Sequence, residues 1–300
     1  MPGNVTPEAA APRLTDPPAD RWFRTRPDSS VLGRPRLLAR LLIDLDELDD
    51  RIALYERLQG VPADLRMPIP DFGGLELAAV GDVLLIASER RFTPVQRRTA
   101  YSLIVPSLTA QLGLLVPTGT TVVEPTEEIV PGRRARVRYP DGSLAELVEH
   151  RPRPGELPDP RPGISVREAT DTGVRLLARR AVPADRLDEA VRFYGTALET
   201  DPRRAGDALS AVVGGLLLTG TDEPDPASVA FALRAPSVET VTRLAGSGRA
   251  TTRGPGGRPV VTLADGVRAE VWERSPRPAA PGGGRRVRPF GWRAAPPRRA

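Results

Sequence analysis

The sequence predicts an α+β protein with two related domains, at residues 35–150 and 173–274. The first observation behind this prediction is a set of short motifs that occur twice, in the same order. The second is a repeated cycle of a strand, a helix and two or three further strands. The third is a proline-rich stretch, residues 151–172, which separates the two copies as a semi-extended linker. A chain of 300 residues is long enough to bury two hydrophobic cores.

The repeated motifs align the two copies with each other. The chain contains RLLAR at 36–40 and 175–179, Leu54-Tyr55 matched by Phe193-Tyr194, Val-Pro-Ser-Leu at 105–108 matched by Ala-Pro-Ser-Val at 235–238, and DGSLAE at 141–146 matched by DGVRAE at 265–270. The separation between matching motifs shortens along the chain, as loop deletions in the second copy would produce. The two segments are therefore interpreted as duplicated domains.

The first copy shows the secondary-structure pattern most clearly. Residues 36–44 alternate between apolar and mixed positions, which predicts a strand with a different environment on each face. Residues 47–58 carry apolar side chains at helical spacing, and Gly60 follows their end, which predicts a helix. Two strands joined by a tight turn follow at 75–80 and 82–88. The second cycle comprises a strand at 99–105, a helix at about 107–116, and strands near 120–124, 133–139 and 143–149.

The absence of certain residue types excludes several kinds of chemistry. The chain has no cysteine, so it has no disulfide, thiolate nucleophile or thiolate-bound metal. Its one histidine, His150, excludes a site built on several imidazoles, and its position beside the linker predicts a solvated loop residue. The chain contains no run of 18 apolar residues, so the sequence predicts no membrane span. The amino terminus lacks the pattern of a signal peptide, so a cytoplasmic location is expected.

The positive charge is concentrated at the end of the chain. The net charge is +5, yet no acid follows Glu273 whereas eight arginines do, so the remainder carries a slight negative excess. Residues 1–34 and 275–300 are predicted to be disordered because of their proline, glycine and polar content. The arginine-rich tail predicts weak, charge-driven association with nucleic acid or anionic lipid. Within the folded part, Arg133-Arg134 is interpreted as a solvated face.

Three further features resemble the vicinal oxygen chelate superfamily of glyoxalases, bleomycin-resistance proteins and dioxygenases. They are a first strand that runs into Asp44-Leu45-Asp46, a helix that carries Leu54-Tyr55, and Pro140-Asp141-Gly142 ahead of Glu146-Leu147 in a closing strand. The resemblance covers about 240 residues. It implies that each domain consists of two βαβββ modules whose strands form a cup around a small-molecule site.

The resemblance also implies where a metal would bind. The family's ligand positions correspond to Arg40, Ala100 and Glu146 in the first copy and to Arg179, Ala230 and Glu270 in the second. A guanidinium group has no lone pair with which to ligate a metal, and a divalent cation needs three or four nitrogen or oxygen ligands. We therefore expect no metal and no other cofactor. Each arginine should instead lie beside the glutamate of its own copy.

Strand alternation predicts which side chains face the two cups. The candidate ligand-binding residues are Leu38, Arg40, Ser102 and Glu146 in the first copy and Arg179, Arg234, Glu270 and Trp272 in the second. Apolar walls with a few fixed polar groups are typical of a small-molecule site. The alternative is that side chains or a partner domain fill each cup, which would then be only a core. No catalytic residue is assigned.

These observations favour a small-molecule binding protein that sequesters an apolar or aromatic compound without a metal, as resistance proteins of the family do. The first alternative is a metal-dependent lyase, isomerase or dioxygenase of the same superfamily. A third possibility is a structural or regulatory protein whose tails bind partners. Because the duplicated domains can pair within one chain, we predict a monomer with an internal pseudo-dimer.

Overall fold

The computed structural model describes residues 28–69, 74–129, 132–151, 171–222, 230–246, 252–253 and 257–273. These residues form two eight-stranded mixed sheets. The predicted disorder of residues 275–300, and with it the predicted partner binding of the tail, lies outside the described residues, as does most of the predicted linker. No helix among the described residues is both long and apolar enough to cross a membrane.

The first sheet has the order β2-β3-β4-β1-β5-β8-β7-β6. Its strands are β1 (Arg36–Asp44), β2 (Ala63–Ile69), β3 (Leu75–Val80), β4 (Val83–Ser88), β5 (Thr99–Ile104), β6 (Thr121–Ile129), β7 (Gly132–Arg138) and β8 (Leu144–Glu149). The first strand of each half pairs in parallel with the last strand of that half, and β1 and β5 join the halves antiparallel. The sheet therefore consists of two βαβββ modules.

The second sheet repeats this arrangement in the order β10-β11-β12-β9-β13-β16-β15-β14. Its strands are β9 (Arg175–Val182), β10 (Arg203–Ala205), β11 (Asp207–Val213), β12 (Leu216–Gly220), β13 (Phe231–Ala235), β14 (Thr252–Arg253), β15 (Pro259–Thr262) and β16 (Arg268–Glu273). Within each half of this sheet too, the first strand pairs in parallel with the last strand, β9 with β12 and β13 with β16. The α+β fold class and the tandem βαβββ modules are confirmed.

The long helices begin and end where the sequence provides caps. Helix α1 (Leu48–Gln59) ends at Gly60, whose φ of 69° lies in the left-handed region that glycine adopts without strain. Helices α3 (Leu108–Leu115) and α5 (Val238–Ala245) each follow a Pro-Ser pair, and the serine side chain accepts a hydrogen bond from the helix backbone. The repeated Pro-Ser motif is therefore a helix cap.

In the first copy, one strand and one short helix were not predicted from the sequence. Strand β2 contains a proline, which a central strand would not tolerate, but β2 lies at the edge of its sheet. The short helix α2 (Pro94–Arg98) begins with a capping box between Thr93 and Gln96. The amino-terminal segment also becomes regular before residue 35. Residues Ser29–Val31 form a 3-10 turn, and the buried Ser29 donates its backbone N–H to the carbonyl of His150 at 3.1 Å.

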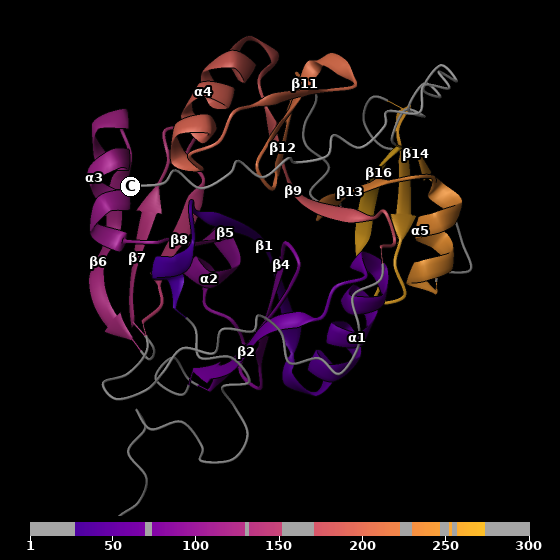
Figure 1. Cartoon of the computed structure of the whole chain (residues 1–300), viewed down its shortest axis with the longest axis horizontal. Coiled ribbons are helices and arrows are strands. Elements are labelled where there is room, and N and C mark those ends of the chain that lie inside the picture. The colour runs from indigo at the N-terminus through magenta and orange to yellow at the C-terminus, as the bar shows by residue number, and fades with distance from the viewer. Residues whose placement is uncertain are drawn as a thin grey trace, which may run out of the picture.

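The helices of the two copies pack against one another in two pairs, α3 near α4 (Leu187–Ala197) and α1 near α5 (Figure 1). Each first-module helix therefore meets a second-module helix of the other copy. One continuous hydrophobic core includes buried side chains from both copies, with Tyr55 of α1 and Tyr194 of α4 among them. The two copies therefore share a core.

Two reciprocal hydrogen bonds explain why the tyrosine and Asp-Gly motifs are repeated. Tyr55 on α1 donates to Oδ2 of Asp265, which lies in the turn before β16, at 2.8 Å. Tyr194 on α4 donates to Oδ2 of Asp141, in the matching turn of the first copy, also at 2.8 Å. Each carboxylate also binds an arginine of the opposite copy. The repeated motifs thus build the interface between the copies.

We expect Tyr55→Phe to lower the free energy of unfolding by about 1.5–3 kcal/mol, because it removes a buried hydrogen bond to a charged acceptor. Urea denaturation measures this loss. Tyr194→Phe is the matched variant at the related position and should cost a similar amount. A loss below about 0.5 kcal/mol in both variants would mean that these bonds do not stabilise the interface.

Candidate ligand-binding site

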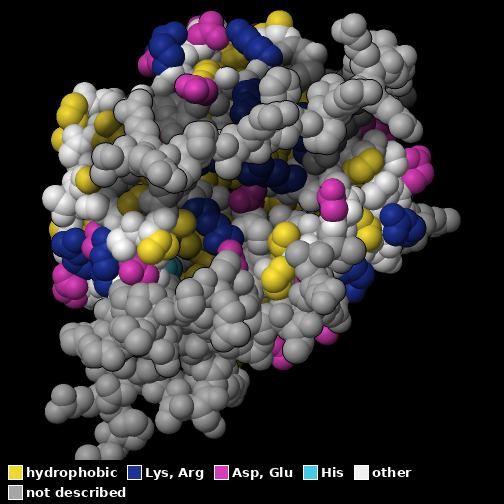
Figure 2. Space-filling view, in the orientation of Figure 1, with side chains coloured by type: hydrophobic (Ala, Val, Ile, Leu, Met, Phe, Trp, Pro, Cys, Tyr) yellow, Lys and Arg dark blue, Asp and Glu magenta, His cyan; other side chains and the backbone are white. Residues whose placement is uncertain are grey.

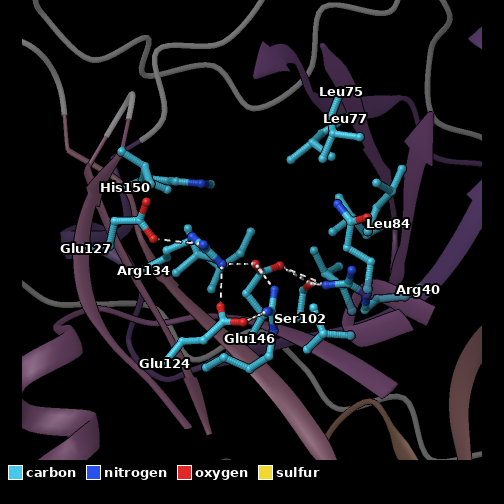
Figure 3. A pocket seen from close by; sticks show the side chains of 18 of the residues that line it. Arg40, Leu75, Leu77, Leu84, Ser102, Glu124, Glu127, Arg134, Glu146 and His150 are labelled. Atoms are coloured by element: carbon cyan, nitrogen blue, oxygen red, sulfur yellow. Dashed lines mark hydrogen bonds and ion pairs between the residues drawn. The ribbon is translucent and has the colours of Figure 1, made fainter. Parts of the chain in front are cut away.

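The concave face of the first sheet holds a cavity of about 570 Å³. This volume is within the range of small-molecule sites. One wall is apolar and comes from β2, β3 and β4, where Met67, Leu75, Leu77 and Ile86 contribute to the lining. Basic, acidic and hydrophobic side chains are interspersed over the described part of the face seen in Figure 2. The cavity itself combines apolar walls with a charged floor (Figure 3).

The floor is centred on Glu146 of β8. Arg40 of β1 donates from Nη1 to Oε2 of Glu146 at 2.8 Å and to the hydroxyl of Ser102 of β5 at 3.0 Å. The side chain of Arg40 is only 4% exposed. These contacts form because β1, β5 and β8 are neighbours in the sheet, which places the three residues side by side. The predicted contact between Arg40 and Glu146 is confirmed.

Two further arginines, both on β7, complete the charged floor. Arg134 and Arg136 each donate to Oε1 of Glu146 at 3.2 Å. Their other partners are on the neighbouring strand β6, where Glu127 accepts from Arg134 at 2.8 Å and Glu124 accepts from both arginines. Three guanidinium groups therefore surround the carboxylate of Glu146. The carboxylates of Glu124 and Glu127 bind the two β7 arginines from the side of β6.

Electrostatics keep the floor charged. Burial by itself raises the pKa of Glu146, but the positive charges of Arg40, Arg136 and Arg134 outweigh it and hold that pKa below its usual value. Burial lowers the pKa of Arg40, and the attraction of Glu146 partly offsets this effect. The guanidinium group of arginine does not lose its proton in proteins. Glu146 is thus a carboxylate and Arg40 a cation at neutral pH.

Ala100, the β5 position that the resemblance assigns to a metal ligand, does not line the cup. The pairing of β5 with β8 shifts register between Thr99 and Tyr101, so Ala100 has no partner on β8 and Ser102 lies opposite Glu146. At this β-bulge Ala100 is the extra residue, and its side chain packs against the shared core. In the second copy Ala232, rather than Ala230, is opposite Glu270. The first-copy triad is consequently Arg40, Ser102 and Glu146.

His150 is not a solvated loop residue, contrary to the sequence interpretation. It is only 4% exposed, and its side chain lines the cavity (Figure 3). Burial, together with the nearby positive charges of Arg36 and Arg151, lowers the pKa of His150 to about 4. The imidazole is therefore neutral at pH 7. The segment at Ser29 that packs on the histidine backbone could not be anticipated from the proline-rich sequence around it.

The second sheet holds a related but smaller charged cluster. Arg179 donates from Nε to Oε2 of Glu270 at 2.9 Å, and both side chains are 3% exposed, so this predicted contact is also confirmed. Arg258 binds Oε1 of the same glutamate at 3.2 Å, and its guanidinium lies 3.5 Å from the centre of the Trp272 ring. Cation–π contact of this type stabilises a cation over an indole.

The candidate residues therefore separate into two groups. Leu38, Arg40, Ser102 and Glu146 all line the cavity of the first sheet. Arg179, Glu270 and Trp272 are buried or nearly so and cluster in the second sheet. Arg234 is exposed, and it faces Trp272 and Arg175 across neighbouring strands without entering the buried cluster.

Sequence reasoning missed the β6 and β7 side chains that supply most of the charged floor. The interpretation of Arg133-Arg134 as a solvated face is wrong for Arg134, whose side chain is 14% exposed and lines the cavity. Strand alternation could have shown this, because Ala135 and Val137 are buried in the core while Arg134 and Arg136 point to the other face. The apolar wall was missed because β2 was not predicted and because the side chains of the two predicted strands at 75–80 and 82–88 were not assigned to the cup.

No family model matches the chain, and no curated protein is significantly similar in sequence. Among solved structures, an uncharacterized protein from Methanosarcina mazei is 32% identical over 39% of this chain and 92% of that chain, with a TM-score of 0.35. The Mn(II)-bound glyoxalase from Novosphingobium aromaticivorans is 14% identical over 82% of both chains, with a TM-score of 0.44. An extradiol ring-cleaving dioxygenase from B. fuscum is 15% identical over 86% of this chain and 76% of that chain, with a TM-score of 0.47.

The strand order itself identifies the fold. Each sheet contains two βαβββ modules whose first strands meet at its centre, and the first sheet curves around a cavity at the place where the resemblance expects one. The carboxylate of Glu146 occupies the expected position in the closing strand of that cup. The predicted resemblance is thereby confirmed at the level of architecture, and this chain has the fold of the vicinal oxygen chelate superfamily.

Proposed function

We propose that this chain is a small-molecule binding protein of the sequestering or resistance type, and that the cup of the first sheet holds an apolar or aromatic compound. The observation that carries this proposal is the cavity of about 570 Å³, with its apolar wall and its charged floor. A floor of fixed polar groups orients a ligand whose apolar body is buried against the opposite wall.

The residues at the family's metal position do not fit a divalent cation. Arg40 stands where one of the ligands would be, and its guanidinium has no lone pair to offer. A cation beside Glu146 would also face the positive charges of Arg40, Arg134 and Arg136. Among the described residues, no group of three or more His, Cys, Asp or Glu side chains could hold a metal ion. The proposal therefore contains no metal-dependent step.

The second candidate function is a metal-dependent lyase, isomerase or dioxygenase of the same superfamily. Glu146 favours it, because this residue occupies the place of the family's carboxylate ligand in the last strand of the cup. The dioxygenase and the glyoxalase named above belong to this class. Metal analysis of the purified chain separates the two functions, since a stoichiometric bound metal would favour the enzyme.

Ligand binding in the cup is tested by blocking the cavity. Leu77→Trp should fill it, because Leu77 lines the apolar wall and is partly accessible. We expect naphthylmethanol, a neutral aromatic probe, to raise the melting temperature of the native chain by mass action but not that of the variant. The matched control is Leu209→Trp, at a position that is 51% exposed on the second sheet. Equal shifts in all three proteins would place binding outside the cup.

A further inference from the structure

The charges on the floor of the cup determine which ligand head group it can accept, provided that the cup is a binding site as proposed above. Glu146 is already fully engaged: its two oxygens accept from Arg40 at 2.8 Å and from Arg134 and Arg136 at 3.2 Å each. The hydroxyl of Ser102 lies 3.5 Å from one of these oxygens. A carboxylate has about four acceptor positions, so Glu146 offers little to a donor on the ligand.

A cationic head group does not fit this floor. An ammonium group would have to approach Glu146 among three guanidinium groups, none of which can release its proton. Repulsion between like charges a few ångströms apart is strong where water is partly excluded. Glu146, Glu124 and Glu127 balance the three guanidinium charges, but each is already bound to an arginine, so an ammonium group would have to displace that arginine to gain a partner.

An anionic head group can take the place of existing partners. Arg134 and Arg136 are held on their other side by Glu124 and Glu127, whose side chains are 33% and 49% exposed on the edge strand β6. Because both glutamates are partly exposed, their carboxylates can turn into solvent and be hydrated there while an anion takes their place beside the arginines. The two guanidinium groups remain mostly buried, at 14% and 4% exposed, and present planar sets of donors suited to an oxyanion.

We propose that the cup takes an apolar or aromatic acid whose carboxylate, or a comparable oxyanion, binds Arg134 and Arg136, and that Glu124 and Glu127 compete with it for these arginines. Figure 3 shows the geometry that favours this ligand: Arg134, Glu124 and Glu127 lie on one side of the cavity, and Leu75 and Leu77 lie on the other. The acid group and the apolar body of one molecule would contact these two regions together. The β6 glutamates are then internal competitors that set the affinity.

The head-group preference is tested by calorimetry on the full chain with three probes that share one aromatic body: naphthoate, naphthylmethanol and naphthylmethylammonium. We expect naphthoate to bind about tenfold more tightly than the alcohol, the gain that one additional charge-assisted hydrogen bond provides. The ammonium should bind most weakly. If the alcohol or the ammonium binds as tightly as naphthoate, the inference is wrong while the proposed binding function stands.

The role of β6 is tested by removing its competing charges. The double variant Glu124→Gln, Glu127→Gln should raise the affinity for naphthoate more than the affinity for naphthylmethanol. Glu128→Gln is the matched control, because Glu128 is on the same strand but does not line the cavity. Weaker naphthoate binding in the double variant would overturn the competition. Absence of binding by all three probes, in the native chain and in the variants, would refute the proposed function as well.

Discussion

Replacing Glu146 with alanine is expected to lower the free energy of unfolding by about 3–5 kcal/mol, the cost of leaving a buried charge without its partner. The side chain of Arg40 is 4% exposed, and Glu146 is the carboxylate it binds. After the substitution, Arg40 would keep only its hydrogen bond to Ser102. Urea denaturation of the variant and the native chain measures the difference.

Two matched variants show whether the loss of stability comes from burial of the charge that is left without a partner. Glu127→Ala removes a carboxylate from the same cluster, but the Glu127 side chain is 49% exposed, so its loss should cost no more than about 1 kcal/mol. Arg40→Ala should cost less than Glu146→Ala, because Arg134 and Arg136 would still neutralise the glutamate. Equal losses for Glu146→Ala and Glu127→Ala would contradict this account of the floor.

Acid should destabilise the chain through His150. Its pKa is lowered from 6.5 to about 4 in the folded state, so the unfolded chain binds more protons between these values. The stabilising contribution is therefore fully present above pH 6.5 and is lost as the pH falls towards 4. The expected loss is about 3 kcal/mol, since each pKa unit corresponds to about 1.4 kcal/mol.

The histidine's part in this pH dependence is isolated by His150→Gln. The variant should show a flatter dependence of unfolding free energy on pH between 6.5 and 4 than the native chain, whatever its carboxylates contribute. Because the chain has one histidine, its imidazole protons also give a single NMR titration that reports the pKa directly. A pKa near 6.5 in the folded chain would show that the imidazole is hydrated, and the predicted loss would not occur.

The fold could be predicted because its determinants are local and are repeated. Strand alternation, the Pro-Ser helix caps and the paired tyrosine and Asp-Gly motifs are each visible within a few residues, and each occurs twice. The contact between Arg40 and Glu146 could be predicted for a related reason. It depends only on which strands are neighbours, and the resemblance supplies that order.

The features that could not be predicted depend on irregularities of the backbone or on contacts between residues that are far apart in the sequence. The bulge at Ala100 changes the register by one residue, and no residue type in β5 marks it. His150 is buried because a segment more than a hundred residues earlier, at Ser29, packs on its backbone. The inward position of Arg134 contradicts the usual exposure of adjacent arginines, and only the pairing with Glu146 and the β6 acids makes it favourable.

The reciprocal tyrosine–aspartate bonds have a consequence for cooperativity. The turn that carries Asp141 holds the helix of the other copy, while the turn that carries Asp265 holds the helix of the first. Neither copy can lose its structure without withdrawing support from both helices and exposing the shared core. The 300-residue chain should therefore unfold in one calorimetric transition, and neither half, expressed alone, would retain the stability that it has in the whole.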